Sequence, residues 1–217
     1  MKIAALDPGK QKSQFGFVGI DVKDNKIYIL GAKRWGREQY TVLEDYIANE
    51  IHPKHRFNFY VVEINNVGIH VAEVLEQKHL PIVAVNTSAN LKKDNSKTMD
   101  KNAMVNWLLQ FQQQGRLIWP NKTTPEVEEL KRQWSLFEEH KTDAGRVSYH
   151  APGEEYDDLT MALILACWLG RQYIDNDQTM VVASHKHQYG HDKDEWGSGI
   201  PKHIRDWESV RREVYMP

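Results

Sequence analysis

Four acidic residues are candidates for metal-dependent chemistry because each stands where a predicted strand ends or a predicted helix begins. Asp7 follows the apolar run KIAAL and precedes Pro-Gly, and Glu63 closes the apolar run FYVV. Asp157 and Asp158 stand directly before the apolar run LTMALILACWLG. A carboxylate in such a place is costly if it is buried alone, so these four residues raise the question of whether they act together.

Ligand sites of α/β proteins form at the carboxyl ends of the strands. If the strand before Asp7 lies beside the strand before Glu63, the two carboxylates share one end of the sheet, and a helix beginning at Asp157 and Asp158 reaches the same place. Oxygen ligands without a cluster of Cys or His favour Mg²⁺ or Mn²⁺ over zinc. The single cysteine, Cys167, lies within the apolar run and excludes a cysteine-based zinc site.

Each of the four acidic residues also has an ordinary structural role. Aspartate before Pro-Gly is a frequent turn residue, and a glutamate at a strand end can form an ion pair with a neighbour. Aspartate is favoured at the N-cap of a helix, where its charge suits the helix dipole. One cap needs one carboxylate, however, and two adjacent aspartates are present. The four positions taken together therefore favour a metal site.

The elements that position these residues follow from the spacing of apolar residues and from the turn signals. Strands are predicted at residues 2–6, 14–22, 26–34, 57–64, 80–86 and 116–120, and helices at residues 38–53, 67–79, 100–115, 124–140 and 157–174. The second and third strands form a hairpin, and strands and helices then alternate. This order predicts an α/β fold with a mixed sheet, its first three strands antiparallel, and helices on both faces.

Composition is that of an ordinary globular protein, with 217 residues, 27% charged residues and a net charge of −2. The first 174 residues are predicted to form one domain, and residues 175–217 a polar tail or small appendage. The tail contains His185, His187 and His191, whose spacing favours a solvated segment over a zinc site. No stretch is long and apolar enough to predict a membrane span, and we expect a reducing, cytoplasmic compartment.

The acidic motifs, taken in order, make the sequence similar to a known family. The segments ALDPG, VVEINNVG and YDDLTMALILA resemble the nuclease domain of the large terminase subunit of tailed bacteriophages, an RNase H-like fold, over about residues 1–170. The family often has His at the position of Tyr156 and an acidic residue at the position of Met161. These two departures imply a ligand shell that is either thinner than the family's or completed from Glu154, Glu155 or Asp143.

The resemblance implies a metal-dependent endonuclease that cuts double-stranded DNA, with viral concatemers as substrate during genome packaging. It implies two Mg²⁺ or Mn²⁺ ions, with Asp7 bridging them, Glu63 on one ion and Asp157 and Asp158 on the other. The family's ATPase motor and portal are the implied partners, in the host cytoplasm. No GxxxxGK[ST] motif occurs, so this sequence does not itself contain the motor.

Positive and amide side chains near the acidic motifs are candidates for contacts with DNA. The polar segment NLKKDNSKTMDK supplies four lysines, and two asparagines follow Glu63: Lys92, Lys93, Lys97, Lys101, Asn65 and Asn66. Phosphate and shape contacts are expected here, without direct reading of the bases. The ordinary role of the two asparagines is a turn leading into the next helix.

Two other functions fit the same motifs. A Holliday-junction resolvase of the RuvC type has a similar acidic centre but acts as a dimer on branched DNA. A non-catalytic module that binds DNA or the portal would keep the fold, yet such a module would not need the acidic residues that this sequence contains.

Overall fold

The computed structural model describes residues 1–9, 14–36, 39–65, 67–87, 97–141, 147–153 and 155–174, with the backbone alone at 97, 98 and 141. The predicted appendage from residue 175 to 217 lies outside these ranges. Among the helices in the described ranges, none combines the length and apolar character needed to cross a membrane.

A seven-stranded mixed sheet forms the centre of the described part, in the order β6-β5-β4-β1-β2-β3-β7. The strands are β1 (Lys2–Asp7), β2 (Phe15–Lys23), β3 (Lys26–Trp35), β4 (Phe59–Glu63), β5 (Ile82–Asn86), β6 (Lys97–Thr98) and β7 (Leu117–Ile118). The pairs β1–β2 and β2–β3 are antiparallel, and β4 pairs in parallel with β1. The predicted mixed sheet with three antiparallel first strands is therefore confirmed.

The β2–β3 hairpin has the tight turn that its sequence predicts. Asp24 and Asn25 both have positive φ, at 52° and 55°. Two such residues form the turn whose twist matches that of the two strands. On its other side β2 pairs with β1, and Gly16 of β2 lies opposite Asp7 of β1.

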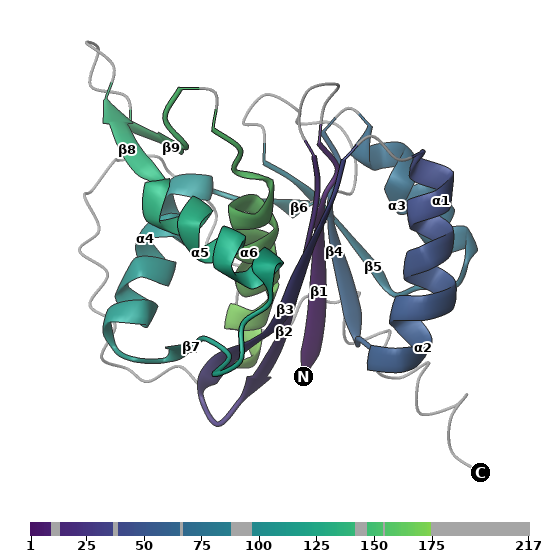
Figure 1. Ribbon diagram of the computed structural model, residues 1–217, viewed down its shortest axis with the longest axis horizontal. Coiled ribbons are helices and arrows are strands. Elements are labelled where there is room, and N and C mark those ends of the chain that lie inside the picture. Colours follow the sequence, from purple (N-terminus) through teal and green to yellow (C-terminus); the bar gives the residue numbers. More distant parts are fainter. Residues whose placement is uncertain are drawn as a thin grey trace, which may run out of the picture. The chain divides into compact units, whose positions relative to one another are not determined.

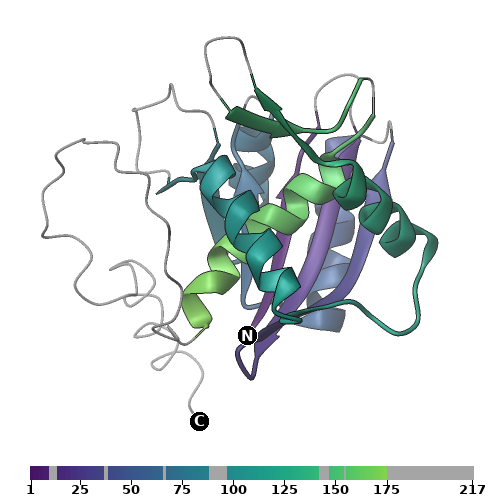
Figure 2. The same ribbon diagram turned by 90° about the vertical axis from the view of Figure 1, so that its left-hand side faces the viewer.

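Helices cover both faces of the sheet, as Figures 1 and 2 show. One face carries α1 (Tyr40–Tyr46), a π-helical segment (Ile47–Ile51), α2 (His52–His55) and α3 (Gly68–Gln77). The other face carries α4 (Lys101–Gln113), α5 (Pro125–Leu136) and α6 (Asp158–Gly170), which ends in a short 3₁₀ turn (Arg171–Tyr173). Because both faces are covered, the central strands consist of nearly continuous apolar residues.

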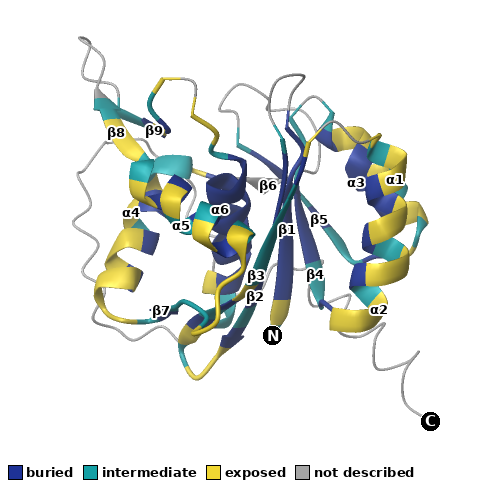
Figure 3. Ribbon diagram, in the orientation of Figure 1, coloured by how far each residue is buried: buried dark blue, intermediate teal, exposed yellow. Residues whose placement is uncertain are grey.

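Helix α6 is the most deeply buried element of the described part. All 13 of its residues are buried, and it appears uniformly dark in Figure 3. A Cβ added at Gly170 would contact Ile3, Ile20 and Val22, which locates the end of α6 against β1 and β2. A helix that is apolar on every side needs this complete cover, and here the sheet and its neighbouring helices provide it.

Two predicted helix boundaries are wrong. The helix predicted to stop at Pro53 continues to His55 and ends at Arg56, which has φ of 51°. The π-helical segment before the proline widens the turn, which relieves the clash between the proline ring and the carbonyl four residues back.

The helix predicted over residues 124–140 instead ends at Leu136. Glu138–Lys141 forms β8, which pairs antiparallel with β9 (Val147–His150). Phe137, which lies between α5 and β8, has an extended backbone. Its ring stacks on the rings of Trp134 and Tyr149, with centroid distances of 6.3 Å and 6.4 Å. These distant contacts outweigh the local helical preference of the segment.

Candidate functional site

Asp7 and Glu63 lie side by side at one end of the sheet. They end β1 and β4, which are adjacent and parallel, with Leu6 opposite Val62. Asp7 is only 9% exposed. Burial raises the pKa of Asp7 well above its usual value, and the charge of Glu63 and a hydrogen bond between the two carboxyl groups act in the same direction. Such a bond requires a proton on one of the two groups.

The start of α6 brings Asp158 to the same place. Asp158 is 3% exposed, and the backbone N–H of Gln14 donates to its Oδ2 at 3.3 Å. Burial raises the pKa of Asp158 to about 6; the charge of Asp157 adds to this, whereas the Gln14 N–H and Arg34 oppose it. Both Asp157 and Asp158 also raise the pKa of Asp7 through their charge. Four carboxylates from β1, β4 and the beginning of α6 therefore act on one another.

Gly16 and Gly68 permit this close packing. A Cβ at Gly16 would lie 2.4 Å from the carbonyl oxygen of Asp158, and a Cβ at Gly68 would lie within bonding range of the carbonyl oxygen of Glu63. Any larger residue would displace the start of α6 from β2, or the start of α3 from the end of β4. The glycines thus fix how near the acidic residues come.

Glu63 is held by two neighbours. The amide nitrogen of Asn65 donates to Glu63 Oε1 at 2.6 Å and to Thr87 Oγ1 at 2.7 Å, and the hydroxyl of Thr87 also donates to Glu63 Oε1. Asn65, predicted to contact phosphate or metal-bound water, therefore contacts the acidic residue beside it. Asn66 lies outside the described residues.

Lys101 is the predicted DNA-binding lysine whose side chain the structure describes. It is the first residue of α4, and its ammonium lies 5.0 Å from the centre of the Phe137 ring. Burial lowers the pKa of Lys101, whereas the charges of Asp157, Glu63 and Asp7 raise it. A positive group therefore faces the acidic cluster. Lys92 and Lys93 lie outside the described residues, and only the backbone of Lys97, in β6, is described.

A second set of charged side chains comes from α5, β3 and the segment before α6. Glu129 of α5 forms ion pairs with Arg34 of β3 at 3.0 Å and with Arg132 at 2.8 Å. Arg132 also pairs with Glu155 at 2.9 Å. The hydrogen bond from Arg132 lowers the pKa of Glu129 to about 2, although burial opposes this. Glu155, a candidate for completing the ligand shell, is therefore engaged by an arginine. Glu154 and Asp143 lie outside the described residues, and Met161 is buried in the core.

The acidic cluster has the right ligand chemistry for a hard divalent cation, because every donor is a carboxylate oxygen. Within the described ranges, no three acidic, cysteine or histidine side chains already converge at ligating distance on one point. A cation bound among these carboxylates would favour their ionised forms, so its binding would oppose the rise in the pKa of Asp7.

Sequence patterns did not single out Thr87, Gln14, Gly16 or Gly68. Each acts through a contact with a residue far along the chain or through the absence of a side chain, so no local pattern marks it. The pair Asn65 and Thr87, for example, spans 22 residues.

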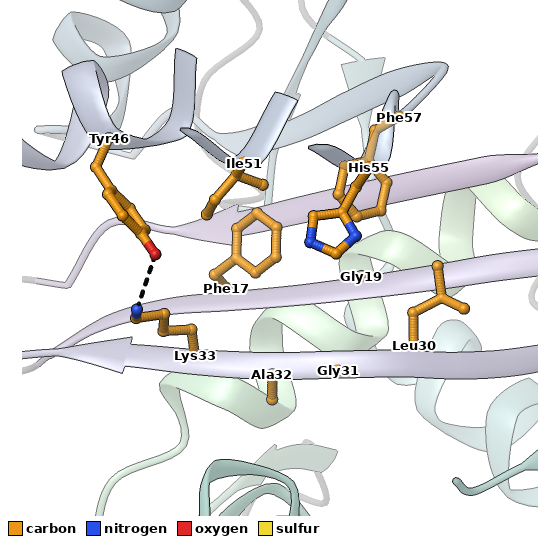
Figure 4. A pocket seen from close by; sticks show the side chains of 10 residues that line it. All are labelled: Phe17, Gly19, Leu30, Gly31, Ala32, Lys33, Tyr46, Ile51, His55 and Phe57. Atoms are coloured by element: carbon orange, nitrogen blue, oxygen red, sulfur yellow. Dashed lines mark hydrogen bonds between the residues drawn. The ribbon is translucent and has the colours of Figure 1, made fainter. Parts of the chain in front are cut away.

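A cavity of about 170 Å³ lies away from the acidic cluster, between the β2–β3 hairpin and the π-helical segment. Figure 4 shows its lining, which includes Phe17, Phe57 and Ile51, with the Lys33 ammonium bonded to the Tyr46 hydroxyl at 3.2 Å. No carboxylate lines it. The cavity is therefore not part of the acidic site.

A family described as the terminase RNaseH-like domain matches residues 4–167 of the sequence. Among curated proteins, none matches the chain.

Solved structures with a similar fold include terminase nucleases of viruses. The large terminase nuclease of thermophilic phage G20c with bound magnesium superposes with a TM-score of 0.56 at 19% identity, over 76% of this chain and 79% of that one. The nuclease domain of the human cytomegalovirus terminase, soaked in manganese, gives 0.53 at 15% identity, over 78% and 82%. The large terminase of another thermophilic bacteriophage gives 0.56 at 13% identity, over 76% of this chain and 38% of that one.

Proposed function

Because this chain belongs to the terminase RNase H-like domain family, we propose that it is a divalent-metal-dependent endonuclease that cuts double-stranded viral concatemers during genome packaging. One observation carries the proposal: carboxylates from β1, β4 and the start of α6 lie close together, and burial raises the pKa values of two of them, Asp7 and Asp158. A protein maintains such mutual repulsion at a functional site more often than elsewhere.

Asp7, Glu63 and Asp158, with Asp157 beside them, would hold two Mg²⁺ or Mn²⁺ ions. The structures of the G20c and cytomegalovirus nucleases, with bound magnesium and soaked in manganese, support this choice of ion. When bound, such ions lower the pKa of water and stabilise the attacking and leaving oxygens of a phosphodiester. Asp7 is the proposed ligand of both ions, because the charges of Glu63 and of Asp158 both act on it.

The protein's own side chains orient the ligands and the DNA. Asn65 and Thr87 fix one oxygen of Glu63, so its other oxygen remains for the cluster. The Lys101 ammonium faces the carboxylates and supplies positive charge where a phosphate group would approach them. Lys92, Lys93 and Lys97, which precede α4, extend this basic contribution in the proposal.

The proposed partners are the ATPase motor and portal of a packaging machine in the host cytoplasm. The large terminase of the second thermophilic bacteriophage supports the link to a larger protein, because the match covers 38% of its length.

The test is nicking of supercoiled plasmid by the purified chain with Mg²⁺, with Mn²⁺ and with a chelator. Cleavage that requires the metal and disappears in Asp158→Asn is the expected result. Asp45→Asn is the matched control, because Asp45 is exposed on α1 and pairs with Lys78 at 2.7 Å. Cleavage of four-way junctions in preference to linear duplex would replace the proposal with a junction resolvase, and metal-independent cleavage would remove the acidic site from it.

A further inference from the structure

Gln133 of α5 joins two parts of the site through a side chain that is completely buried. Its Oε1 accepts hydrogen bonds from the backbone N–H of Leu159 at 2.9 Å and of Thr160 at 3.4 Å. Its Nε2 donates to Glu129 Oε1 at 3.2 Å. Both ends of the amide are therefore used.

These two N–H groups are the ones that an N-cap residue normally satisfies. Helix α6 begins at Asp158, so Leu159 and Thr160 are its second and third residues. Asp157 occupies the N-cap position, yet its side chain makes no capping hydrogen bond, and its ψ of 10° departs from the extended conformation of a usual cap. The cap of α6 thus comes from another helix.

Helices α4 and α5 of the same protein are capped in the usual way. Asp100 is extended and accepts from the N–H of Ala103, and Thr124 is extended and accepts from the N–H of Val127. Asp157 and Asp100 are both aspartates, and aspartate is a favoured N-cap residue. The difference at α6 therefore comes from the surroundings and not from the residue type.

The orientation of the Gln133 amide is determined by its partners. Glu129, ionised and paired with Arg34 and Arg132, can only accept a hydrogen bond, so it takes the NH₂ group. The backbone N–H groups of α6 can only donate, so they take the oxygen. The ion-paired arginines thereby hold the cap in one orientation.

We propose that Gln133 is a positioning residue, which caps α6 from α5 so that the carboxylates of Asp157 and Asp158 are left to the acidic cluster. Where it concerns metal binding, this inference rests on the proposed function. The capping itself does not.

The first experiment measures capping through thermal unfolding without metal, using Asp157→Ala and Gln133→Met separately and together. In the wild-type background Asp157→Ala should leave the melting temperature unchanged or raise it, because no cap is lost and repulsion falls. In the Gln133→Met background Asp157→Ala should lower it, because Asp157 then serves as the cap. An equal loss in both backgrounds would overturn the inference.

The second experiment measures Mn²⁺ affinity of the same chain by electron paramagnetic resonance of free Mn²⁺. Gln133→Met should weaken binding roughly tenfold, the effect typical of losing a residue that orients metal ligands. Gln112→Met is the matched control. Gln112 of α4 accepts a hydrogen bond at 2.7 Å from the indole of Trp134, the residue that follows Gln133 in α5. The control should lower stability without changing Mn²⁺ affinity.

The outcomes separate the two proposals. A lower melting temperature of Gln133→Met with unchanged Mn²⁺ affinity would make Gln133 a structural residue and overturn its positioning role. A wild-type chain that binds no Mn²⁺ would overturn the proposed function, and the unfolding cycle would still decide the cap. If Gln133→Met does not fold, Gln133→Asn gives the same measurements, because its shorter side chain withdraws the oxygen from α6.

Discussion

Within the part of the chain that the structure describes, buried carboxylates occur in two regions, and their surroundings differ. Glu44 of α1 lies in the core between α1 and α3, with a side chain that is 1% exposed. Neither of its oxygens has a hydrogen-bond partner among the described residues, and the His70 Nε2 lies 4.0 Å away. At the end of the sheet, Asp7 bonds to Glu63 and Asp158 accepts the Gln14 N–H.

Burial alone therefore does not distinguish a functional carboxylate. It raises the pKa of Glu44, with the charges of His70 and Lys78 opposing, and it raises the pKa values of Asp7 and Asp158. The acidic cluster differs because three elements bring several carboxylates together, with Lys101 facing them. A lone acid lowers stability, whereas a supported cluster can exchange its protons for a cation.

The largest effect should come from removing charge in the cluster. Asp7→Asn, Glu63→Gln and Asp158→Asn should each reduce metal-dependent plasmid nicking by at least about 10²-fold, the scale of losing a principal electrostatic group. Thermal unfolding should show unchanged or higher stability, because the repulsion falls. A variant that cuts at the wild-type rate would place the chemistry elsewhere, and one that unfolds would show the residue to be structural.

The close approach of α6 to β2 should be the next most sensitive feature. Gly16→Ala should lower the free energy of unfolding by about 2 kcal/mol, because the new Cβ overlaps the carbonyl of Asp158. Urea denaturation measures this directly. Gly31→Ala on the same hairpin is the control, since a Cβ there meets no atom within 4 Å. Equal losses in the two variants would mean that contact with α6 does not cause the effect.

Lys101→Met should have a smaller effect, on binding more than on stability. Methionine keeps an apolar chain over Phe137 but removes the charge that faces the acidic residues. DNA affinity should fall roughly tenfold at low salt, and the slope of log affinity against log salt should decrease by about 0.9. Lys26→Met, an exposed site at the start of β3, should change neither quantity. An unaltered salt slope in Lys101→Met would exclude a phosphate contact.

The smallest effect is expected at Glu44, and only on stability. Since burial raises the pKa of Glu44, the folded chain holds that proton more tightly than the unfolded chain. Its stabilising contribution is complete below the unfolded pKa and is lost as the pH rises through the folded pKa. Glu44→Gln should therefore raise the free energy of unfolding by about 1 kcal/mol at neutral pH and flatten its decline with pH.

Plasmid nicking by Glu44→Gln should equal that of the wild type. A loss of cleavage in this variant would contradict the conclusion that Glu44, unlike the acidic cluster, affects stability alone.

Much of the fold was predictable because its signals are local. The apolar runs before Asp7 and Glu63 and the turn at Asp24 and Asn25 predict the strands, and their order along the chain predicts a mixed sheet whose first three strands are antiparallel. The proximity of Asp7 and Glu63 could be anticipated for the same reason. Their role as ligands, with Asp157 and Asp158, stays a prediction.

The features that escaped prediction depend on distant contacts. The segment after Leu136 has helical sequence, but stacking of Phe137 on Tyr149 makes it a strand. The cap of α6 comes from Gln133, and a single glutamine in an amphipathic helix has no distinguishing pattern. Asn65 was recognised as a candidate, but its bond to Thr87 was not.

The complete burial of α6 also determines when the acidic cluster can form during synthesis. The face of β1 and β2 that carries Ile3, Ile20 and Val22 receives its cover from α6, the last helix of the described chain apart from its short 3₁₀ end. During synthesis the N-terminal strands leave the ribosome first. Their apolar face therefore stays uncovered until α6, about 150 residues downstream, has been made. Long-range pairing of this kind slows folding. The helix that completes the core also carries Asp158, so a nascent chain acquires its final fold and its acidic cluster in the same step.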